Sequence, residues 1–574
     1  FGSRLKGIIH NPSFARSVLA SAPFAMWAFL ILGLVAAEMA MPEDECAGDC
    51  ALKVLMQLGA LKTSQAARSD DPAGLKTSVY QRPKNHMDLN AKEFVIHETC
   101  KKPPCSGQVH LQLGGPGEML VSFVSQPESD TASRVRYGTS SLEKEAVGTA
   151  ETYSQLMFWR EDLWDPPLKG GYGLNQAIVA KDMSTSTWAF DSSSGWKYPS
   201  FREVGEQQVE GDKLGWYKNP GERYDSPMVH TVKLTDLTPG TTYTYQVEND
   251  GRSFTFTMPK EGQKYPYHVG LVGDIGQTPV SNSSMHLLSG LKPDVVLLTG
   301  DLCYADGYYP RWDSFGIMFE PLGSQVPVMS CPGNHEYGSA EAYKSYNLRY
   351  PMPFAQSGSS DPNYWSRDIG PMHVVSLNSY ASSKPGSYQY KWLSQDLKSF
   401  DRQKTPWLLV IMHAPWYNSN LGHYGEAKVM MEHLEEMFFE HGVNLVLAGH
   451  VHSFERTWPV YKNQTNSCGP TYINIGDGGN REGPYAHWLP FENEEKAWSA
   501  FRQGAFGIGD LKIMNDTHAF FTWKRNACFD HGEAEFNAAN CSSTGDNSKN
   551  SLSPDDVSWI VRASGKCQNQ GPLE

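Results

Sequence analysis

Residues 294–304 read DVVLLTGDLCY, an apolar run that ends in Gly-Asp. A continuous Val/Leu run with polar residues only at its carboxyl end is typical of a strand buried on both faces, as in the sheet of an α/β protein. Four more runs of this form alternate with helix-like stretches: HVGLVGD (268–274), VPVMSCPGN (326–334), LLVIMH (408–413) and VNLVLAGH (443–450). The sequence therefore predicts an α/β domain whose site is assembled at the strand ends.

Each of these strand ends carries oxygen or nitrogen donors. The seven donors are Asp274, Asp301, Tyr304, Asn334, His413, His450 and His452. Taken singly, a Gly-Asp at a strand end is more often a turn, and a histidine is more often a hydrogen-bonded core residue. Five such ends within one domain instead predict a two-metal hydrolytic centre. Because residues i and i+2 of an extended strand share a face, the last two histidines would project together if GHVH is extended, and each could reach a different ion of a pair.

The sequence before this domain, from residue 105 to 260, has a different pattern. Its short alternating runs predict β-strands. They include QVHLQL (108–113), MLVSFV (119–124), RVRYG (134–138) and TYTYQV (242–247). The segment LTPGTTY (237–243) has the spacing of a tyrosine corner, which indicates an all-β sandwich of immunoglobulin or fibronectin type. Residues 154–222 interrupt the pattern, and we expect them to form an insertion with some structure of its own.

Both ends of the chain are expected to lie outside these two domains. Residues 1–40 contain the apolar run APFAMWAFLILGLVAA (22–37), which predicts a signal peptide cleaved near Val35 and Ala37, or otherwise an uncleaved signal anchor. Residues 41–104 are expected to be a linker or propeptide. The catalytic domain is expected to span 261–526. The remaining residues, 527–574, form a predicted C-terminal tail in which VSWIVRA (557–563) is one docked strand.

Composition and charge restrict the class of protein further. The chain has 574 residues, of which 40% are apolar and 12% aromatic, and this excludes a disordered protein. It carries 49 Lys and Arg against 63 Asp and Glu, a net charge of −14, which is opposite in sign to the charge of a nucleic-acid binder. An acidic protein that handles anionic substrates needs a local positive centre, and a bound metal is the strongest one available.

Ten cysteines and four N-glycosylation sequons favour an oxidising compartment, either the extracellular space or the endomembrane lumen. The sequons are at Asn282, Asn463, Asn515 and Asn540. Candidate short-range disulfides are Cys46 with Cys50 and Cys100 with Cys105, and Cys528, Cys541 and Cys567 could staple the tail. Cys303 and Cys331 lie inside the strand-end motifs, where a free buried thiol is at least as well supported as a bridge.

Five short blocks together resemble the signature of the purple acid phosphatases, within the calcineurin-like metallophosphoesterase superfamily. The blocks are GDIG (273–276), GDLCY (300–304), GNHE (333–336), VIMH (410–413) and GHVH (449–452). The resemblance extends over roughly residues 105 to 525, and further stretches support it: FERTWPVY (454–461), INIGDGGNREG (473–483) and NDTHAFFTWKRN (515–526). It is to the large plant-type form and implies an αββα metallophosphoesterase sandwich preceded by a fibronectin-like domain.

The resemblance also implies a division of the donors between two ions. Asp274, Tyr304 and His452 look like ligands of Fe(III), with Asp301 as a bridge. Asn334, His413 and His450 look like ligands of a divalent ion, which is Zn, Mn or Fe. The chemistry agrees, because phenolate and carboxylate are hard donors suited to Fe(III), whereas imidazole and neutral amide oxygen suit the divalent ion. With charges of about +5 on the metals and −3 on their ligands, such a centre stays positive.

Three residues near the donors have roles implied by the resemblance. His335 and His423, together with Asn334, are expected to bind the phosphate, with His335 protonating the leaving oxygen. Glu336 is expected to hydrogen-bond an imidazole or amide outside the ligands. The sequence departs from the family at Gly422, where plant-type members commonly carry another histidine, and this puts one proton donor or phosphate contact in doubt. A second departure is FGIG (506–509) in place of FGHG.

These observations predict a binuclear metal-dependent acid phosphatase that hydrolyses phosphomonoesters by attack of a metal-bound hydroxide, without a phosphoenzyme. A diphosphatase or phosphodiesterase of the same superfamily is the alternative. A sandwich-based binding protein without catalysis is a third possibility, which the complete donor set disfavours. The expected partners are small-molecule phosphate esters and not nucleic acid, with membrane association only if residues 22–37 remain uncleaved.

Overall fold

The structure is a computed structural model that describes residues 105–126, 131–156, 223–307, 309–338, 341–489, 497–526 and 554–562, together with four short strands between residues 159 and 218. The predicted signal segment, the linker and most of the tail lie outside the described residues. Among the residues that are described, no helix is long and apolar enough to cross a membrane.

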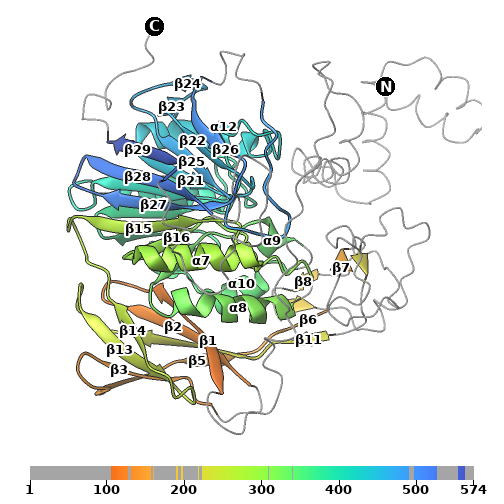
Figure 1. Cartoon of the computed structure of the whole chain (residues 1–574), viewed down its shortest axis with the longest axis vertical. Coiled ribbons are helices and arrows are strands. Elements are labelled where there is room, and N and C mark those ends of the chain that lie inside the picture. Colours follow the sequence, from red (N-terminus) through yellow and green to blue (C-terminus); the bar gives the residue numbers. More distant parts are fainter. Residues whose placement is uncertain are drawn as a thin grey trace, which may run out of the picture. The chain divides into compact units, whose positions relative to one another are not determined.

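Two four-stranded sheets form the N-terminal part, as the alternating sequence predicts (Figure 1). One sheet has the order β1-β2-β12-β5 and the other the order β14-β13-β3-β4, and neighbouring strands are antiparallel. The strands are β1 (Ser106–Leu113), β2 (Met119–Ser125), β3 (Arg134–Gly138), β4 (Lys144–Val147), β5 (Thr149–Glu151), β12 (Met228–Leu234), β13 (Thr242–Val247) and β14 (Phe254–Thr257). The predicted tyrosine corner is confirmed, because the Thr238 backbone N–H donates to the Tyr243 hydroxyl at 3.0 Å.

The insertion in this sandwich begins and ends at a pair of antiparallel strands, β6 and β11. Within it, β10 pairs with β7 and β9 pairs with β8. The strands are β6 (Ser154–Leu156), β7 (Trp159–Arg160), β8 (Ala189–Asp191), β9 (Gly195–Lys197), β10 (Tyr217–Lys218) and β11 (Arg223–Asp225).

Two mixed sheets form the second part of the molecule. The six-stranded sheet has the order β17-β16-β15-β27-β28-β29, and the seven-stranded sheet has the order β18-β19-β20-β21-β25-β22-β26. The strands of the first are β15 (Tyr267–Val272), β16 (Val295–Leu298), β17 (Val328–Ser330), β27 (Gly507–Ile513), β28 (His518–Arg525) and β29 (Asp556–Val561). Those of the second are β18 (Trp365–Ile369), β19 (Met372–Ser376), β20 (Trp407–Ile411), β21 (Leu445–Ala448), β22 (Phe454–Thr457), β25 (Thr471–Ile475) and β26 (Ser499–Gln503). The strand predicted from VSWIVRA is β29, which pairs with β28.

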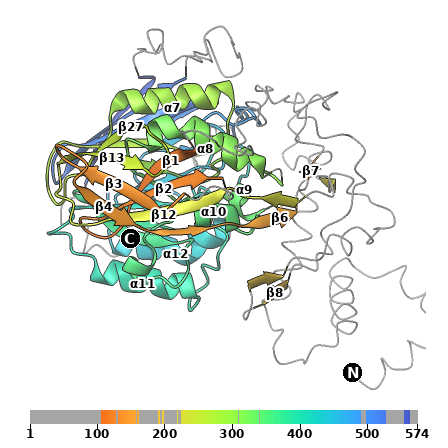
Figure 2. The same ribbon diagram turned by 90° about the horizontal axis from the view of Figure 1, so that it is seen from below.

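Helices cover the outer faces of the two sheets, which completes the predicted αββα sandwich (Figure 2). In β20 the apolar side chains alternate: Leu409 and Ile411 pack into the core between the sheets, while Leu408 and Val410 pack with the outer helices α11 and α12. This two-sided burial is the reason for the continuous apolar runs in the sequence. The helices are α7 (Pro279–Leu291), α8 (Pro310–Gly323), α9 (Asn334–Tyr337), α10 (Lys344–Arg349), α11 (Tyr388–Ser399) and α12 (Lys428–Glu440). Smaller elements are η3 (Ala355–Ser357), β23 (Val460–Tyr461) and β24 (Gln464–Thr465).

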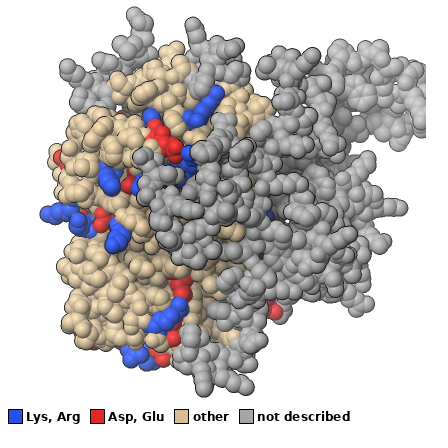
Figure 3. All heavy atoms as spheres, viewed as in Figure 1, with Lys and Arg blue, Asp and Glu red and all other residues tan. Residues whose placement is uncertain are grey.

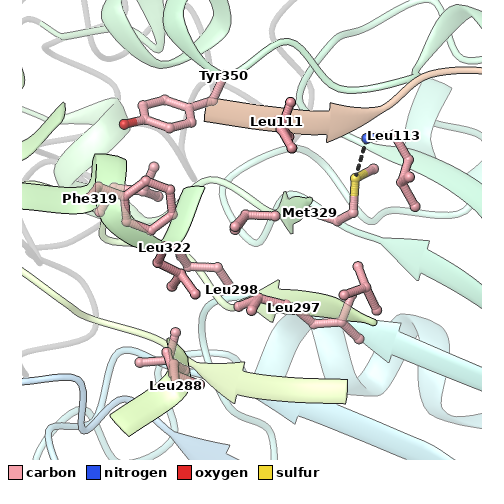
Figure 4. Close-up of a cluster of buried hydrophobic side chains, with 14 of the residues drawn as sticks. Leu111, Leu113, Leu288, Leu297, Leu298, Phe319, Leu322, Met329 and Tyr350 are labelled. Carbon is pink, nitrogen blue, oxygen red and sulfur yellow. Dashed lines mark hydrogen bonds between the residues drawn. The ribbon is translucent and has the colours of Figure 1, made fainter. Parts of the chain in front are cut away.

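The β-sandwich packs against the six-stranded side of the second part through β1. Leu111 and Leu113 of β1 lie in one buried cluster with Met329 of β17 and with residues of α8, and the Leu113 N–H approaches the Met329 sulfur at 3.3 Å (Figure 4).

On the face drawn in Figure 3, the acidic and basic side chains of the described surface are interspersed. The visible described surface of that face therefore carries no single acidic patch.

Candidate metal centre

One set of donors, Asp274, Tyr304 and His452, meets beyond the carboxyl end of β15. The Tyr304 hydroxyl lies 3.1 Å from Asp274 Oδ1 and 3.0 Å from His452 Nε2. His452 Nε2 is also 3.4 Å from Asp274 Oδ1. All three side chains are buried. A carboxylate, a phenol and an imidazole thus converge at distances at which one ion could contact all of them.

A second set of donors meets beyond the ends of β16 and β20. His413 Nε2 lies 3.0 Å from Asp301 Oδ2 and 3.0 Å from Asn334 Oδ1. One ligand atom each from Asp301, His413 and His450 lies within 4.8 Å of the others. The His450 N–H donates to both oxygens of Asp274, so the two sets of donors are directly connected. The structure therefore brings all seven predicted donors together, in two adjoining sets.

The surroundings of the second set fit a metal ion. His413 Nδ1 lies 2.7 Å from the Thr299 carbonyl oxygen, which can only accept, so Nδ1 carries the proton and Nε2 presents a lone pair to the site. Asp301 Oδ2 is buried and accepts no hydrogen bond within the part of the chain that the structure describes, although its other oxygen accepts the His335 backbone N–H at 2.9 Å. A buried carboxylate oxygen 3.0 Å from an imidazole nitrogen is unfavourable unless a proton or a metal cation lies between them. The donors present thus fit a metal ion.

The electrostatics of the site reflect the same crowding of donors. Burial raises the pKa of Asp274, and the nearby charge of Asp301 adds to this effect. The pKa of Asp301 is lowered, because His413 and His335 outweigh the effect of burial. Burial raises the pKa of Tyr304, and the two carboxylates raise it further. A phenolate at this position therefore requires a strong local positive charge, which a multivalent ion supplies.

The glycines that precede the donors are required by close approach of the backbone. A Cβ on Gly333 would lie 2.0 Å from Asp301 Oδ1, and one on Gly449 would lie 2.3 Å from Asp274 Oδ2. Several donors also have left-handed backbone conformations, with φ of +54° at Asp274, +53° at Asp301 and +71° at His450. Such conformations in residues other than glycine cost about 1–3 kcal/mol each and concentrate at functional sites.

The GHVH segment is not extended, so its two histidines do not share a strand face. The left-handed His450 and hydrogen bonds from Val451 N–H to the Gly449 carbonyl and from Ser453 N–H to the Val451 carbonyl fold this segment into tight turns. The two histidines nevertheless reach different donor sets, because the turn directs His450 toward His413, with ring centroids 4.9 Å apart, and His452 toward Tyr304.

His335 lies between the two sets of donors. Its ring centroid is 4.0 Å from that of Tyr304, and its Nδ1 is 2.5 Å from a carboxylate oxygen of Asp306. Its Nε2 lies 3.8 Å from Asp301 Oδ2 and 3.8 Å from Glu482 Oε1. Burial opposes the protonated ring, but the neighbouring carboxylates outweigh it and raise the pKa of His335 to about 10. The bond to Asp306 fixes the ring so that Nε2 faces the donors.

His423 and Glu336 occupy different positions around the centre. His423 lies at its rim: the side chain is 47% exposed, and its ring centroid is 3.8 Å from that of His450. Glu336 is buried and accepts the backbone N–H groups of Asp301, Leu302 and Gly333 at 2.8–2.9 Å. Its partners are thus backbone amides of the loops that carry the donors, and none of its hydrogen bonds in the described residues goes to an imidazole.

Sequence reasoning missed several charged and polar residues that hold the site together. Glu426 Oε2 contacts His423 Nδ1 at 2.8 Å and His450 Nε2 at 3.1 Å. Arg481 donates to the Tyr304 carbonyl at 2.8 Å and forms an ion pair with Asp306. Asn480 donates to the Asp274 carbonyl at 3.0 Å. Asn480 and Arg481 belong to the GNREG stretch (479–483) after β25, and this stretch is the sequence signal for them.

The departures from the family pattern lie at two different places. A Cβ on Gly422 would lie 3.1 Å from the Tyr485 ring, so a larger residue there needs a small adjustment. Ile508 of the FGIG stretch is buried in β27 and pairs with Lys524 of β28.

Cys303 and Cys331 are free, buried thiols. Cys105 and Cys468 are disulfide-bonded.

Two sheets packed face to face under outer helices, with convergent donors at the ends of their strands, define this protein as a metallophosphoesterase. Family models agree with this class and narrow it. The model for calcineurin-like phosphoesterases matches residues 267–454, that for the purple acid phosphatase N-terminal domain matches 106–259, and that for the iron/zinc purple acid phosphatase-like C-terminal region matches 469–534.

Curated relatives and a solved structure are similar to most of the chain. Purple acid phosphatase 21 of Arabidopsis thaliana is 40% identical over 362 residues, which are 61% of this chain and 80% of the relative. Probable purple acid phosphatase 20 of the same plant is 34% identical over 445 residues, 76% of this chain and 88% of the relative. A purple acid phosphatase from yellow lupin seeds has the same fold, with a TM-score of 0.55 and 21% identity over 77% of this chain and 76% of that chain. The chain belongs to the purple acid phosphatase family. It is therefore a phosphatase that acts on phosphate monoesters and depends on a binuclear metal centre.

Proposed function

We propose that the chain is an acid phosphatase whose centre holds Fe(III) beside a divalent Zn, Mn or Fe ion. Asp274, Tyr304 and His452 would bind the ferric ion, and Asn334, His413 and His450 the divalent ion, with Asp301 between them. The observation that carries the assignment is that the two sets of contacts coincide with the chemical division of the donors. The first set contains the phenol, the Asp274 carboxylate and one imidazole, and the second contains the amide and two imidazoles beside Asp301.

When bound, the two ions would supply positive charge to the phosphoryl group and activate the attacking water. The chain's own side chains have separate tasks. Asn334 and His423 would orient the phosphate from the side of the divalent ion. His335, held by Asp306, would present Nε2 to the leaving oxygen and protonate it. Glu336 would keep the Asp301 and Gly333 loops at a fixed spacing through its backbone hydrogen bonds.

We also propose the predicted division of the chain, with the sandwich at 105–260, the catalytic domain at 261–526, and flanking segments at 1–40, 41–104 and 527–574. Export to the extracellular space or the endomembrane lumen is part of the proposal. The disulfide bonds of Cys105 and Cys468 support it, because such bonds persist in oxidising compartments. The sequons at Asn463 and Asn515 are exposed, Asn282 is half-buried on α7, and Asn540 lies outside the described residues.

Substrate profiling of the purified protein tests the proposed function. We expect hydrolysis of 4-nitrophenyl phosphate and glycerol 2-phosphate at acidic to neutral pH, loss of activity when the metals are removed by chelation, and recovery when iron and zinc are returned. The alternative activities are measured in parallel with bis(4-nitrophenyl) phosphate and inorganic diphosphate. A kcat/KM that is higher for either of these than for the monoesters would favour the phosphodiesterase or diphosphatase.

A further inference from the structure

Three tyrosine rings lie next to one another beside Asn334, and one of their two contacts is a parallel stack. The Tyr380 hydroxyl donates to Asn334 Oδ1 at 3.2 Å, and the Tyr380 ring centroid is 6.1 Å from that of His413. Tyr337 lies parallel to Tyr380, with 6.2 Å between ring centroids and 3° between ring planes. The Tyr343 ring packs at a tilt against the Tyr337 ring, with 5.3 Å between the ring centroids. We call these three residues the tyrosine ledge. It extends outward from the donors that would bind the divalent ion.

The outer member of the ledge is exposed. The Tyr337 side chain is 55% exposed, whereas Tyr343 and Tyr380 are half-buried. Tyr337 and Asn334 are three residues apart in α9, so they lie on the same face of that short helix. An exposed aromatic ring is ordinary when it is isolated on a surface. Here the Tyr337 ring is stacked on the ring of Tyr380, whose hydroxyl contacts Asn334, a predicted phosphate-binding residue. An aromatic surface therefore lies next to the reaction site.

The ledge is held in place by the backbone around it. Ala342 N–H donates to the Tyr337 carbonyl at 3.1 Å, and Tyr343 N–H donates to the Glu336 carbonyl at 2.8 Å. Tyr343 adopts a left-handed conformation with φ of +60°, and its hydroxyl is hydrogen-bonded to the Asn378 side chain. A rigid aromatic surface loses little conformational entropy when a planar group stacks on it. The ledge is therefore a preformed binding surface.

We propose that the tyrosine ledge is a subsite for the organic part of the substrate and that it selects planar aromatic groups, so that aryl phosphates bind more tightly than alkyl phosphates. This proposal rests on the proposed function, because it assumes that the phosphate is bound at the metal centre beside Asn334. The organic group of the ester must then extend away from the two ions, and on the Asn334 side it meets the ledge. Offset stacking of one aromatic pair corresponds to about a threefold to tenfold gain in affinity.

The kinetic test uses Tyr337→Ala and a pair of esters. The measured quantity is the KM for glycerol 2-phosphate divided by the KM for 1-naphthyl phosphate. We expect this ratio to fall by about threefold to tenfold in Tyr337→Ala and to be retained in Tyr337→Phe, which keeps the ring. The matched control is Tyr388→Ala, because Tyr388 is an 82% exposed tyrosine at the start of α11. An unchanged ratio in Tyr337→Ala overturns the proposal.

A binding measurement separates this proposal from the proposed function. Isothermal titration calorimetry of the purified, metal-containing protein compares phenylphosphonate with methylphosphonate, neither of which needs to be hydrolysed. We expect phenylphosphonate to bind more tightly in the wild type, and the preference to be lost in Tyr337→Ala. Equal affinities in the wild type overturn the ledge even if the protein is an active phosphatase. Conversely, absent hydrolysis of monoesters with a preserved aromatic preference would refute the proposed function and leave the ledge supported.

Discussion

The two carboxylates of the centre are held in different ways. Asp274 accepts the His450 N–H at both oxygens and lies against the Tyr304 hydroxyl. Asp301 accepts a backbone N–H at Oδ1, whereas its buried Oδ2 accepts no hydrogen bond from any described residue. An oxygen without a partner is free to bind a cation, and Oδ2 lies beside the imidazole of His413. This asymmetry favours Asp301 as the carboxylate that bridges two ions.

The assignment of Tyr304 as an iron ligand predicts the colour of the protein. A phenolate bound to Fe(III) produces a visible charge-transfer band, so we expect the oxidised protein to be purple or pink and Tyr304→Phe to be bleached. Hydrolysis should persist at a reduced rate, because a water can take the vacated position and the phenol is not the predicted nucleophile or acid. The measurement is a visible spectrum together with iron analysis.

The control for the colour change is Tyr346→Phe, which removes the hydroxyl of another buried tyrosine, hydrogen-bonded to Ser330. This variant should keep the band. A colourless wild-type protein with one ferric ion per chain would disprove the Tyr304 assignment.

His335 gives a prediction about leaving groups. If His335 donates the proton, His335→Ala should lower kcat by about 10²-fold or more for glycerol 2-phosphate, whose alkoxide is a poor leaving group. The loss should be much smaller for 4-nitrophenyl phosphate, because its leaving group needs little protonation. The rates of both esters are measured under saturating conditions for His335→Ala and for His423→Ala. Equal losses for the two esters in His335→Ala would instead favour His423, which sits at the exposed rim.

At the scale of elements, the strand ends could be predicted and the segments between them could not. The runs that became β15, β16, β17, β20 and β21 are apolar on both faces, and this burial leaves a strong signal in the sequence. The donors follow those strands directly, so their convergence follows from the sheet. Glu426 and Arg481 lie on loops, where the positions of side chains depend on contacts with distant residues. No local periodicity encodes such contacts.

A half-buried charge cluster between the β18–β19 hairpin and α11 should make stability depend on pH. His373 lies 2.7 Å from Asp368 of β18 and 3.0 Å from Asp396 of α11. Burial alone would lower its pKa, but the hydrogen bonds to both carboxylates outweigh burial and raise the pKa to about 9, against an ordinary value of 6.5. The folded state therefore holds the proton more tightly than the unfolded state does.

The sign of the effect follows from this difference. The stabilisation is fully present below pH 6.5, decreases as the pH rises, and is absent above about pH 9. Relative to His373→Gln, the wild type should lose up to about 3 kcal/mol of unfolding free energy between pH 6 and pH 10, since one pKa unit corresponds to about 1.4 kcal/mol. Urea unfolding of both proteins across this range measures it. A difference between them that does not vary with pH would contradict the prediction.

At the scale of the whole molecule, a buried charged cluster joins the β-sandwich to the catalytic part. Arg349 of α10 donates to Asp313 of α8 at 2.8 Å. It also donates to three side chains from the N-terminal part of the chain: Gln108, Tyr153 and Tyr224. These residues are buried. Since α10 follows the loop after α9, the same cluster supports the segment that carries Asn334 and the tyrosine ledge.

This cluster predicts that the two parts of the molecule unfold together and depend on one ion pair. Arg349→Met should lower the unfolding free energy by about 3–5 kcal/mol, because it leaves the Asp313 carboxylate buried without its partner. Adding Asp313→Asn should restore part of that loss, because the uncompensated charge is then removed. A double-mutant cycle from urea unfolding measures the coupling. Losses that add within about 0.5 kcal/mol would show that the pair acts through packing rather than charge. Two separate transitions in the wild type would show that the cluster does not couple the sandwich to the catalytic part.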